Sequence, residues 1–389
     1  MTKGLARWDL FCRVVDNFGD AAVMWRLARQ LAVEHRRRVR LHIDQPAVLR
    51  RLLPQAAPGA RIDGVQLLPL ADDAPAAPGS TALPEADSLA TDVVVSGFHA
   101  ALPPAWRRRM KPGSPLWINL EYLSAEDWIE RFHGLPSPHA DGVVEHYFYP
   151  GFGSSSGGLL CERDLFARRD RFAADRDAAG RFLAGIGVQR RPGETLASLL
   201  CYPDAPLPEL AQQLAGSPAT LHLLVPDGVA VGSGPGSDAT ALTAAAAGRL
   251  RISRIPFLPQ REYDQLLWSC DCNFVRGEDS LVRALWSGRP FIWQIYRQPE
   301  SAHLPKLQAF LGRLPDGLPA SAMRWWNRVP AASAAGLLDL IRSAPGGRPW
   351  LPDELLAGFA RPDLASRLLA FAGGLRRPAA GGKNTAGQL

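Results

Sequence analysis

Residues 8–31 read WDLFCRVVDNFGDAAVMWRLARQL. The first part, residues 8–15, is short and rich in bulky apolar side chains, which is typical of a buried β-strand. Across residues 23–31 the apolar side chains recur at helical spacing and predict a helix over about residues 21–34. A strand that turns directly into a helix is typical of open α/β sheets, which bind ligands at the carboxyl ends of their strands. We therefore expect an α/β protein with a site near this turn.

The turn itself, DNFGD at residues 16–20, sets two carboxylates, Asp16 and Asp20, four residues apart. At the end of a strand both can reach a cleft, so the pair is a candidate catalytic site. A purely structural role is the alternative. In that case Asp20 caps the helix by accepting a backbone N–H, and Asp16 closes a turn with Asn17 and Gly19.

Strand-like runs alternate with helical segments along the rest of the chain. The expected strands cover residues 8–15, 39–43, 92–95, 115–120 and 143–149 in the first half, and 196–202, 220–225, 250–255, 272–276 and 290–295 in the second. This alternation predicts parallel sheets with helices on both faces. We expect two Rossmann-like domains at residues 1–178 and 179–376, facing each other across a cleft, and a disordered tail at 377–389. Residues 54–90 are assigned to loops or a weak excursion, 162–185 to a helical stretch and 226–248 to a flexible insertion.

Composition narrows the functional classes. The 389 residues are 47% hydrophobic and 21% charged, as in a globular protein long enough for two domains. The five cysteines are scattered in apolar runs and are expected to be reduced core thiols. Cys270 and Cys272 have no second cysteine pair nearby, so we expect no structural metal.

The net charge of +6 comes from 40 Arg and only 4 Lys, spread along the chain. That dispersion argues against a nucleic-acid-binding face, although a positive field can attract an acidic protein. The first residues lack the apolar core of a signal peptide, and no run approaches the ~20 apolar residues that span a bilayer. We expect a cytoplasmic protein that binds neither nucleic acid nor membrane.

A second candidate site lies at residues 273–286, NFVRGEDSLVRALW, which indicate a strand, a turn and a helix beginning near Leu281. Gly277 permits a tight turn, and Asp279 or Ser280 can cap the helix. The free N–H groups of that helix start and the guanidinium of Arg276 are suited to a diphosphate, and Glu278 to a sugar hydroxyl. A capped helix with a surface Arg–Glu pair is the alternative.

Four aromatic residues occupy turn-like positions at the expected strand ends of the second half. They are Tyr202, Phe257, Tyr263 and Tyr296. Aromatic faces there can sandwich a nucleobase, at roughly 1–3 kcal/mol per stack. Any one of them considered alone is better explained as an ordinary core residue.

These motifs together resemble the EarP family, the protein-arginine rhamnosyltransferases that modify bacterial elongation factor P. The resemblance rests on DNFGD followed by WRLAR at residues 25–29, and on RGEDSLVRA at 276–284. It also rests on WINLEYLS at 117–124, YFYPGF at 147–152, GGLL at 157–160 and IPFLPQ at 255–260. The matches keep the same order over most of the chain.

The resemblance implies a GT-B glycosyltransferase that uses dTDP-β-L-rhamnose as donor, an arginine of elongation factor P as acceptor, and no metal or other cofactor. By that analogy Asp20 is the general base, and Asp16 and Glu278 are also essential. The residues expected to bind substrate are Asn17, Phe18, Gly19, Tyr202, Phe257, Gln260, Tyr263, Arg276, Gly277, Asp279, Ser280 and Tyr296. One departure is Leu200, where the family pattern has a phenylalanine.

The chemistry fits these side chains. A guanidinium, with a pKa above about 12, has no free lone pair with which to attack a sugar, so it must be held and must lose a proton. A pair of carboxylates can grip its planar fork and accept that proton. Two alternatives remain: a GT-B transferase with another nucleotide sugar and a small-molecule or lipid-linked acceptor, and a non-catalytic nucleotide-sugar-binding partner of a translation factor.

Overall fold

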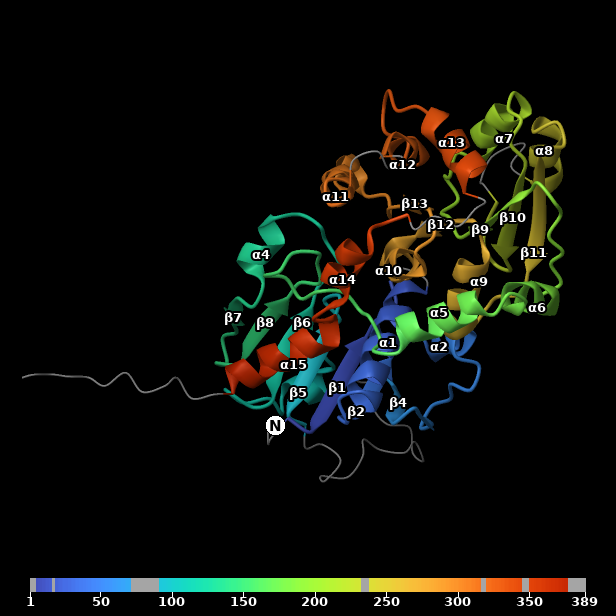
Figure 1. Cartoon of the computed structure of the whole chain (residues 1–389). Helices are drawn as coiled ribbons and strands as arrows, with labels where there is room; N and C mark the ends of the chain where they lie inside the picture. The colour runs from blue at the N-terminus through green and yellow to red at the C-terminus, as the bar shows by residue number, and fades with distance from the viewer. Residues whose placement is uncertain are drawn as a thin grey trace, which may run out of the picture.

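The computed structural model describes residues 5–15, 18–70, 91–231, 238–315, 320–344 and 350–376. Asp16 and Asn17, the tail at 377–389 and the glycine-rich part of the predicted insertion lie outside these residues. Within the described chain, two sheets form two lobes, the first from the N-terminal half and the second from the C-terminal half (Figure 1).

The first sheet has eight strands in the order β3-β4-β2-β1-β5-β6-β8-β7. Its centre is β1 (Arg7–Cys12), which pairs in parallel with β2 (Arg38–Ile43) and β5 (Val93–Gly97). The other strands are β3 (Arg61–Ile62), β4 (Val65–Pro69), β6 (Leu116–Leu120), β7 (Pro136–Pro138) and β8 (Val144–Phe148). Residues 54–90 were expected to form loops or a weak excursion; the described part of this range contains two short strands, β3 and β4, which its many prolines and alanines did not indicate, and residues 71–90 lie outside the described residues. The edge strand β7 was also missed, since two prolines in three residues do not resemble a strand.

The second sheet has five strands, all parallel, in the order β11-β10-β9-β12-β13. They are β9 (Thr195–Leu199), β10 (Leu221–Pro226), β11 (Leu250–Ile255), β12 (Cys272–Arg276) and β13 (Phe291–Gln294). All five were predicted. Four are largely buried runs bounded by turn residues, whereas β11 is buried at its two ends and partly exposed between them.

Helices cover both sheets, as the alternation predicted (Figure 1). In the first half they are α1 (Gly19–Val33), α2 (Pro46–Leu52), α3 (Pro104–Arg107), α4 (Trp128–Phe132), α5 (Leu165–Ala174) and α6 (Ala178–Gly185). In the second they are α7 (Leu207–Ala215), α8 (Ala239–Ala245), α9 (Gln260–Ser269), α10 (Gly277–Ser287), α11 (His303–Leu311), α12 (Ala320–Trp326), α13 (Ala335–Ser343), α14 (Asp353–Ala360) and α15 (Leu364–Leu375). The helical stretch predicted at residues 162–185 is two helices, α5 and α6, separated at Asp175.

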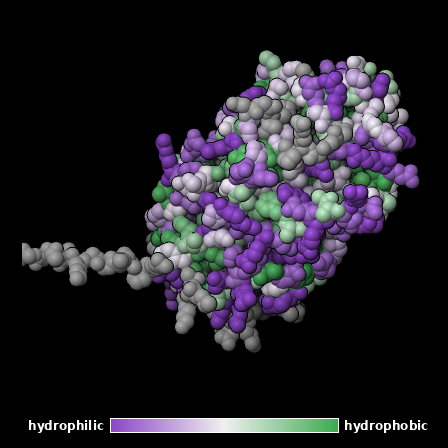
Figure 2. Space-filling view, viewed as in Figure 1, coloured by the Kyte–Doolittle hydropathy of each residue, from purple (hydrophilic) through white to green (hydrophobic). Residues whose placement is uncertain are grey.

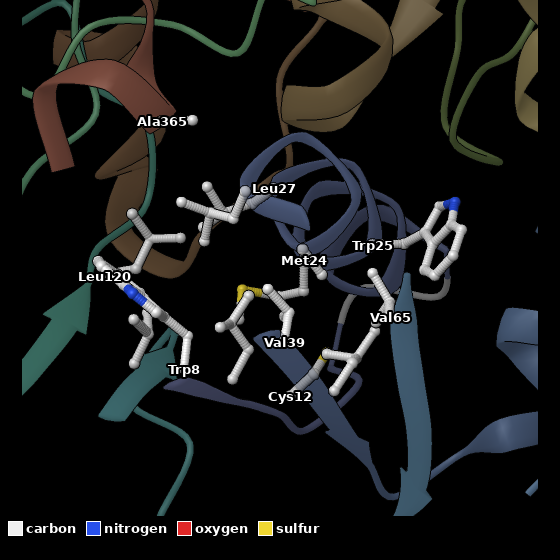
Figure 3. Packing of buried hydrophobic residues seen from close by; sticks show 14 of the residues in the cluster. Trp8, Cys12, Met24, Trp25, Leu27, Val39, Val65, Leu120 and Ala365 are labelled. Atoms are coloured by element: carbon white, nitrogen blue, oxygen red, sulfur yellow. The ribbon is translucent and has the colours of Figure 1, made fainter. Parts of the chain in front are cut away.

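The core of the first lobe lies between its sheet and α1. Met24 and Leu27 point from α1 towards Trp8 and Leu120 of the strands, and Ala365 of α15 belongs to the same buried cluster (Figure 3). The last helix of the chain therefore packs on the first sheet. The predicted domain boundary at residue 178 remains a prediction.

On the outside, hydrophobic residues form separate patches among hydrophilic ones on the face shown in Figure 2. None of the helices in the described ranges combines the length and the apolar character needed to cross a membrane. All five cysteines are buried and unpaired, which confirms the prediction of reduced core thiols.

Candidate functional site

Two adjoining cavities lie where α1 of the first lobe meets α10 of the second. Cavity A encloses about 690 Å³ and is lined by residues that include Phe18, Phe257, Gln260, Tyr263, Arg276 and Ser280. Cavity B encloses about 1030 Å³ and is lined by residues that include Asp20, Tyr122, Leu123, Tyr296 and Lys306. Gly19, Gly277 and Glu278 line both cavities. Residues from both lobes line each cavity.

Asp20 lies in the first turn of α1 and is only 3% exposed. The residue at the N-cap position is Phe18, and the helix start has no side-chain cap. Asp20 Oδ2 instead accepts a hydrogen bond from the backbone N–H of Val15 at 2.8 Å. The alternative that Asp20 is the N-cap is therefore wrong, because Phe18 is at that position and the Asp20 carboxylate accepts from Val15 instead. Asp20 also borders cavity B.

The start of α10 differs from the prediction in register. The helix begins at Gly277, four residues before Leu281, and its N-cap is Arg276. Asp279 and Ser280 therefore lie inside the first turn and do not cap it. Gly277 has a φ of +64°, a left-handed conformation that glycine adopts at little cost, so it turns the chain as predicted. Gly277 and Glu278 of this turn line both cavities, and the first N–H groups of a helix have no partner within the helix.

Two contacts hold the side chain of Arg276 in place. Its Nη1 donates to the carbonyl of Cys201 at 2.7 Å, and its guanidinium carbon lies 4.8 Å from the ring centre of Tyr202. Tyr202 thus supports Arg276 and is not among the residues lining either cavity. Tyr296 contacts Tyr202 edge-on at 5.6 Å and lines cavity B.

An aromatic wall of cavity A joins the two lobes. The rings of Phe18 and Phe257 are 4.8 Å apart, and the guanidinium carbon of Arg51 lies 4.3 Å from the Phe257 ring centre. Tyr263 lines the same cavity, and burial raises the pKa of its hydroxyl. Arg51 was not predicted, because its partners lie far away in the sequence.

Two predicted site residues, the catalytic candidate Glu278 and the substrate-binding candidate Gln260, also link the lobes. Glu278 Oε2 accepts from the backbone N–H of Leu123 at 2.8 Å. Gln260 Nε2 donates to the carbonyl of Ala22 at 3.1 Å. Since Glu278 borders both cavities, its hydrogen bond with Leu123 fixes a carboxylate at their junction.

A polar cluster at the end of β6 was missed. Glu121, 6% exposed, is 2.9 Å from His99 Nε2 and accepts from Asn119 Nδ2 at 3.0 Å. Burial raises the pKa of Glu121, against the opposing effect of His99. The signal was present in the sequence, as polar residues interrupting the apolar run WINLEY.

The most extensive group that sequence reasoning missed is a buried ionic cluster behind cavity A. It comprises Arg26, Glu162, Asp264, Asp279 and Arg283. Asp279, predicted to meet a diphosphate, accepts from Arg26 Nε at 2.8 Å. Within the described ranges, no three His, Cys, Asp or Glu side chains are grouped so as to hold a metal ion.

Comparison with known proteins places this geometry in context. The family model for the elongation factor P (EF-P) rhamnosyltransferase EarP matches residues 8–372. A protein-arginine rhamnosyltransferase of Pseudomonas aeruginosa is 43% identical over 389 aligned residues, which cover 94% of this chain and 99% of that protein. A protein-arginine rhamnosyltransferase of Pseudomonas putida is 45% identical, and the alignment covers 94% of this chain and 98% of that protein.

A solved structure, described as the structural basis for EarP-mediated arginine glycosylation of translation elongation factor EF-P, is also similar. It is 31% identical in sequence and has a TM-score of 0.56. The alignment covers 94% of this chain and 98% of that one.

Proposed function

Because this chain belongs to the EarP family, we propose that it transfers L-rhamnose from dTDP-β-L-rhamnose to an arginine side chain of elongation factor P, with inversion at the anomeric carbon. The chain is a protein-arginine rhamnosyltransferase with the GT-B fold, as the sequence predicted. The observation that carries the proposal is the junction of cavities A and B at Gly277 and Glu278, with Asp20 on the rim.

Cavity A is suited to the nucleotide. Phe257 and Tyr263 offer aromatic surface to a base, and the first turn of α10 offers backbone N–H groups to a diphosphate. Arg276 adds a fixed positive charge at the same place. The carboxylate of Asp279 is already bonded to Arg26, so its contribution to the donor is the backbone N–H of the helix start.

Cavity B is suited to the sugar and the acceptor. In the proposed step, Asp20 takes a proton from a guanidinium nitrogen, and that nitrogen forms a bond to the anomeric carbon. The bond from that carbon to the diphosphate breaks on the opposite face, and dTDP leaves with the electron pair. Glu278, at the junction, faces the positive charge that develops on the sugar. Asp16 holds the guanidinium in this scheme.

The leaving diphosphate gains negative charge, which the α10 N-terminus and Arg276 are placed to stabilise. In the proposal these groups take the part that a metal ion plays in other transferases. The absence of a metal requirement, the EF-P partner and a cytoplasmic location without nucleic acid or membrane remain proposals.

A donor panel tests the assignment. The chain is incubated with EF-P and, in separate reactions, dTDP-β-L-rhamnose, dTDP-glucose or UDP-glucose, and the intact mass of EF-P is measured. We expect a gain of one deoxyhexose with the first donor alone, unchanged by added EDTA. Modification with another donor would support the alternative of a GT-B transferase that uses a different nucleotide sugar. Binding of dTDP-rhamnose without transfer would support the alternative of a non-catalytic nucleotide-sugar-binding protein.

A further inference from the structure

Arg26 is a buried arginine that crosses from the first lobe to the second. It lies on α1, its side chain is 5% exposed, and it contacts three carboxylates. Its Nε is 2.8 Å from Asp279 Oδ1, its Nη1 is 3.3 Å from Glu162 Oε1, and its Nη2 is 3.5 Å from Asp264 Oδ1. Taking an arginine out of water is costly, so an arrangement like this needs well-placed anionic partners.

The shortest of these contacts is made to Asp279. Arg283, whose side chain is 1% exposed, bonds Asp264 through two nitrogens at 2.8 and 2.6 Å and Glu162 at 2.6 Å. Among the described residues, the ion pairs of Asp279 are limited to the one with Arg26. Arg26 is therefore the residue that balances the charge of Asp279.

Asp279 carries its negative charge close to the region where an anion would bind. It lies in the first turn of α10 and lines cavity A together with Arg276 and Ser280. Burial raises the pKa of Asp279, against the opposing effects of Arg26 and Arg283. A carboxylate without a cation in that turn would offset the positive end of the helix and repel an anion bound there.

We propose that Arg26 is a positioning residue for the donor site, which binds and neutralises the Asp279 carboxylate so that the start of α10 can accept the diphosphate. The first lobe then contributes to donor affinity through a residue that does not touch the donor. This inference rests on the proposed function, because it takes cavity A to be the nucleotide site.

A charge-rescue experiment tests it. The affinity for dTDP is measured by calorimetry for the wild type, Arg26→Gln, Asp279→Asn and the double variant, and the donor KM and kcat are measured alongside. We expect Arg26→Gln to bind dTDP about tenfold more weakly, with the larger effect on KM. Asp279→Asn and the double variant should bind within about threefold of the wild type, because the carboxylate has been removed.

The matched control is Arg29→Gln, one helical turn further along α1, where Arg29 pairs with Asp63 at the surface. Its dTDP affinity should equal that of the wild type. A double variant that binds as weakly as Arg26→Gln would overturn the inference, as would Arg26→Gln binding like the wild type or Asp279→Asn alone losing affinity. If Arg26→Gln does not fold, the double variant still decides. Failure of the wild type to bind dTDP would instead contradict the proposed function.

Discussion

An amide substitution separates the observed contact of Asp20 from its proposed role as general base. Its carboxylate accepts the Val15 N–H and borders cavity B. Asparagine keeps an oxygen acceptor for the Val15 N–H but cannot take up a proton at neutral pH. We expect Asp20→Asn to lower kcat about 10²- to 10⁴-fold, the range of general base catalysis, while dTDP affinity stays unchanged.

The measurements are initial rates at saturating donor and calorimetric titration with dTDP. Asp170→Asn, at an exposed pair with Arg169, serves as the control with wild-type activity. A kcat within a few-fold of the wild type for Asp20→Asn would remove Asp20 from the role of base.

A buried histidine, His222, and a half-buried one, His133, make stability depend on pH. Burial, reinforced by Arg251, lowers the pKa of His222 to about 4, and burial with Arg367 lowers that of His133 to about 4. Unfolded histidine titrates near pH 6.5, so between about pH 6.5 and 4 the unfolded chain binds more protons than the folded chain. The contribution of these histidines to the free energy of unfolding should therefore be largest above about pH 6.5. It should decrease as the pH falls from about 6.5 to 4.

Urea unfolding at pH 7.5 and pH 5.0 measures this change. We expect His222→Gln to show a smaller loss between the two pH values than the wild type, since one of the two depressed groups is gone. An equal loss in both proteins would show that His222 does not contribute.

At the scale of elements, the start of α10 depends on the left-handed backbone of Gly277. An alanine there costs about 1–2 kcal/mol in that conformation and shifts the N–H groups that border both cavities. We expect Gly277→Ala to lose stability by about that amount and to bind dTDP more weakly.

Gly288 provides the matched control, because it caps the other end of the same helix with a φ of +69°. Gly288→Ala should lose a similar amount of stability in chemical denaturation and keep its dTDP affinity. If the two variants bind dTDP equally, α10 does not present its first turn to the donor.

The sequence predicted elements whose signal is local. Strands such as β12 are buried apolar runs, and α1 shows helical periodicity, so both were found within a few residues. The start of α10 was misplaced because a glycine with positive φ was interpreted as a separate turn. The cluster around Arg26 was missed because it depends on tertiary packing: Arg26 and Asp279 are 253 residues apart. The one sign of this cluster in the local sequence is a polar side chain on a helix that is buried on two faces.

At the scale of the whole molecule, neither lobe forms the site alone. Phe18 and Phe257 meet across cavity A, and Glu278 bonds to Leu123 at its junction with cavity B. The bond between Gln260 and Ala22 and the ion pairs of Arg26 link the same surfaces. Donor binding and acceptor chemistry should therefore depend on how the lobes are held together.

Tandem mass spectrometry of EF-P tests the central claim most directly, after incubation with this chain and dTDP-β-L-rhamnose. We predict one deoxyhexose on a single arginine, and no modification of an EF-P variant with lysine in its place. A sugar on another residue, a modified lysine variant, or unmodified EF-P in the presence of folded, dTDP-binding enzyme would contradict the account.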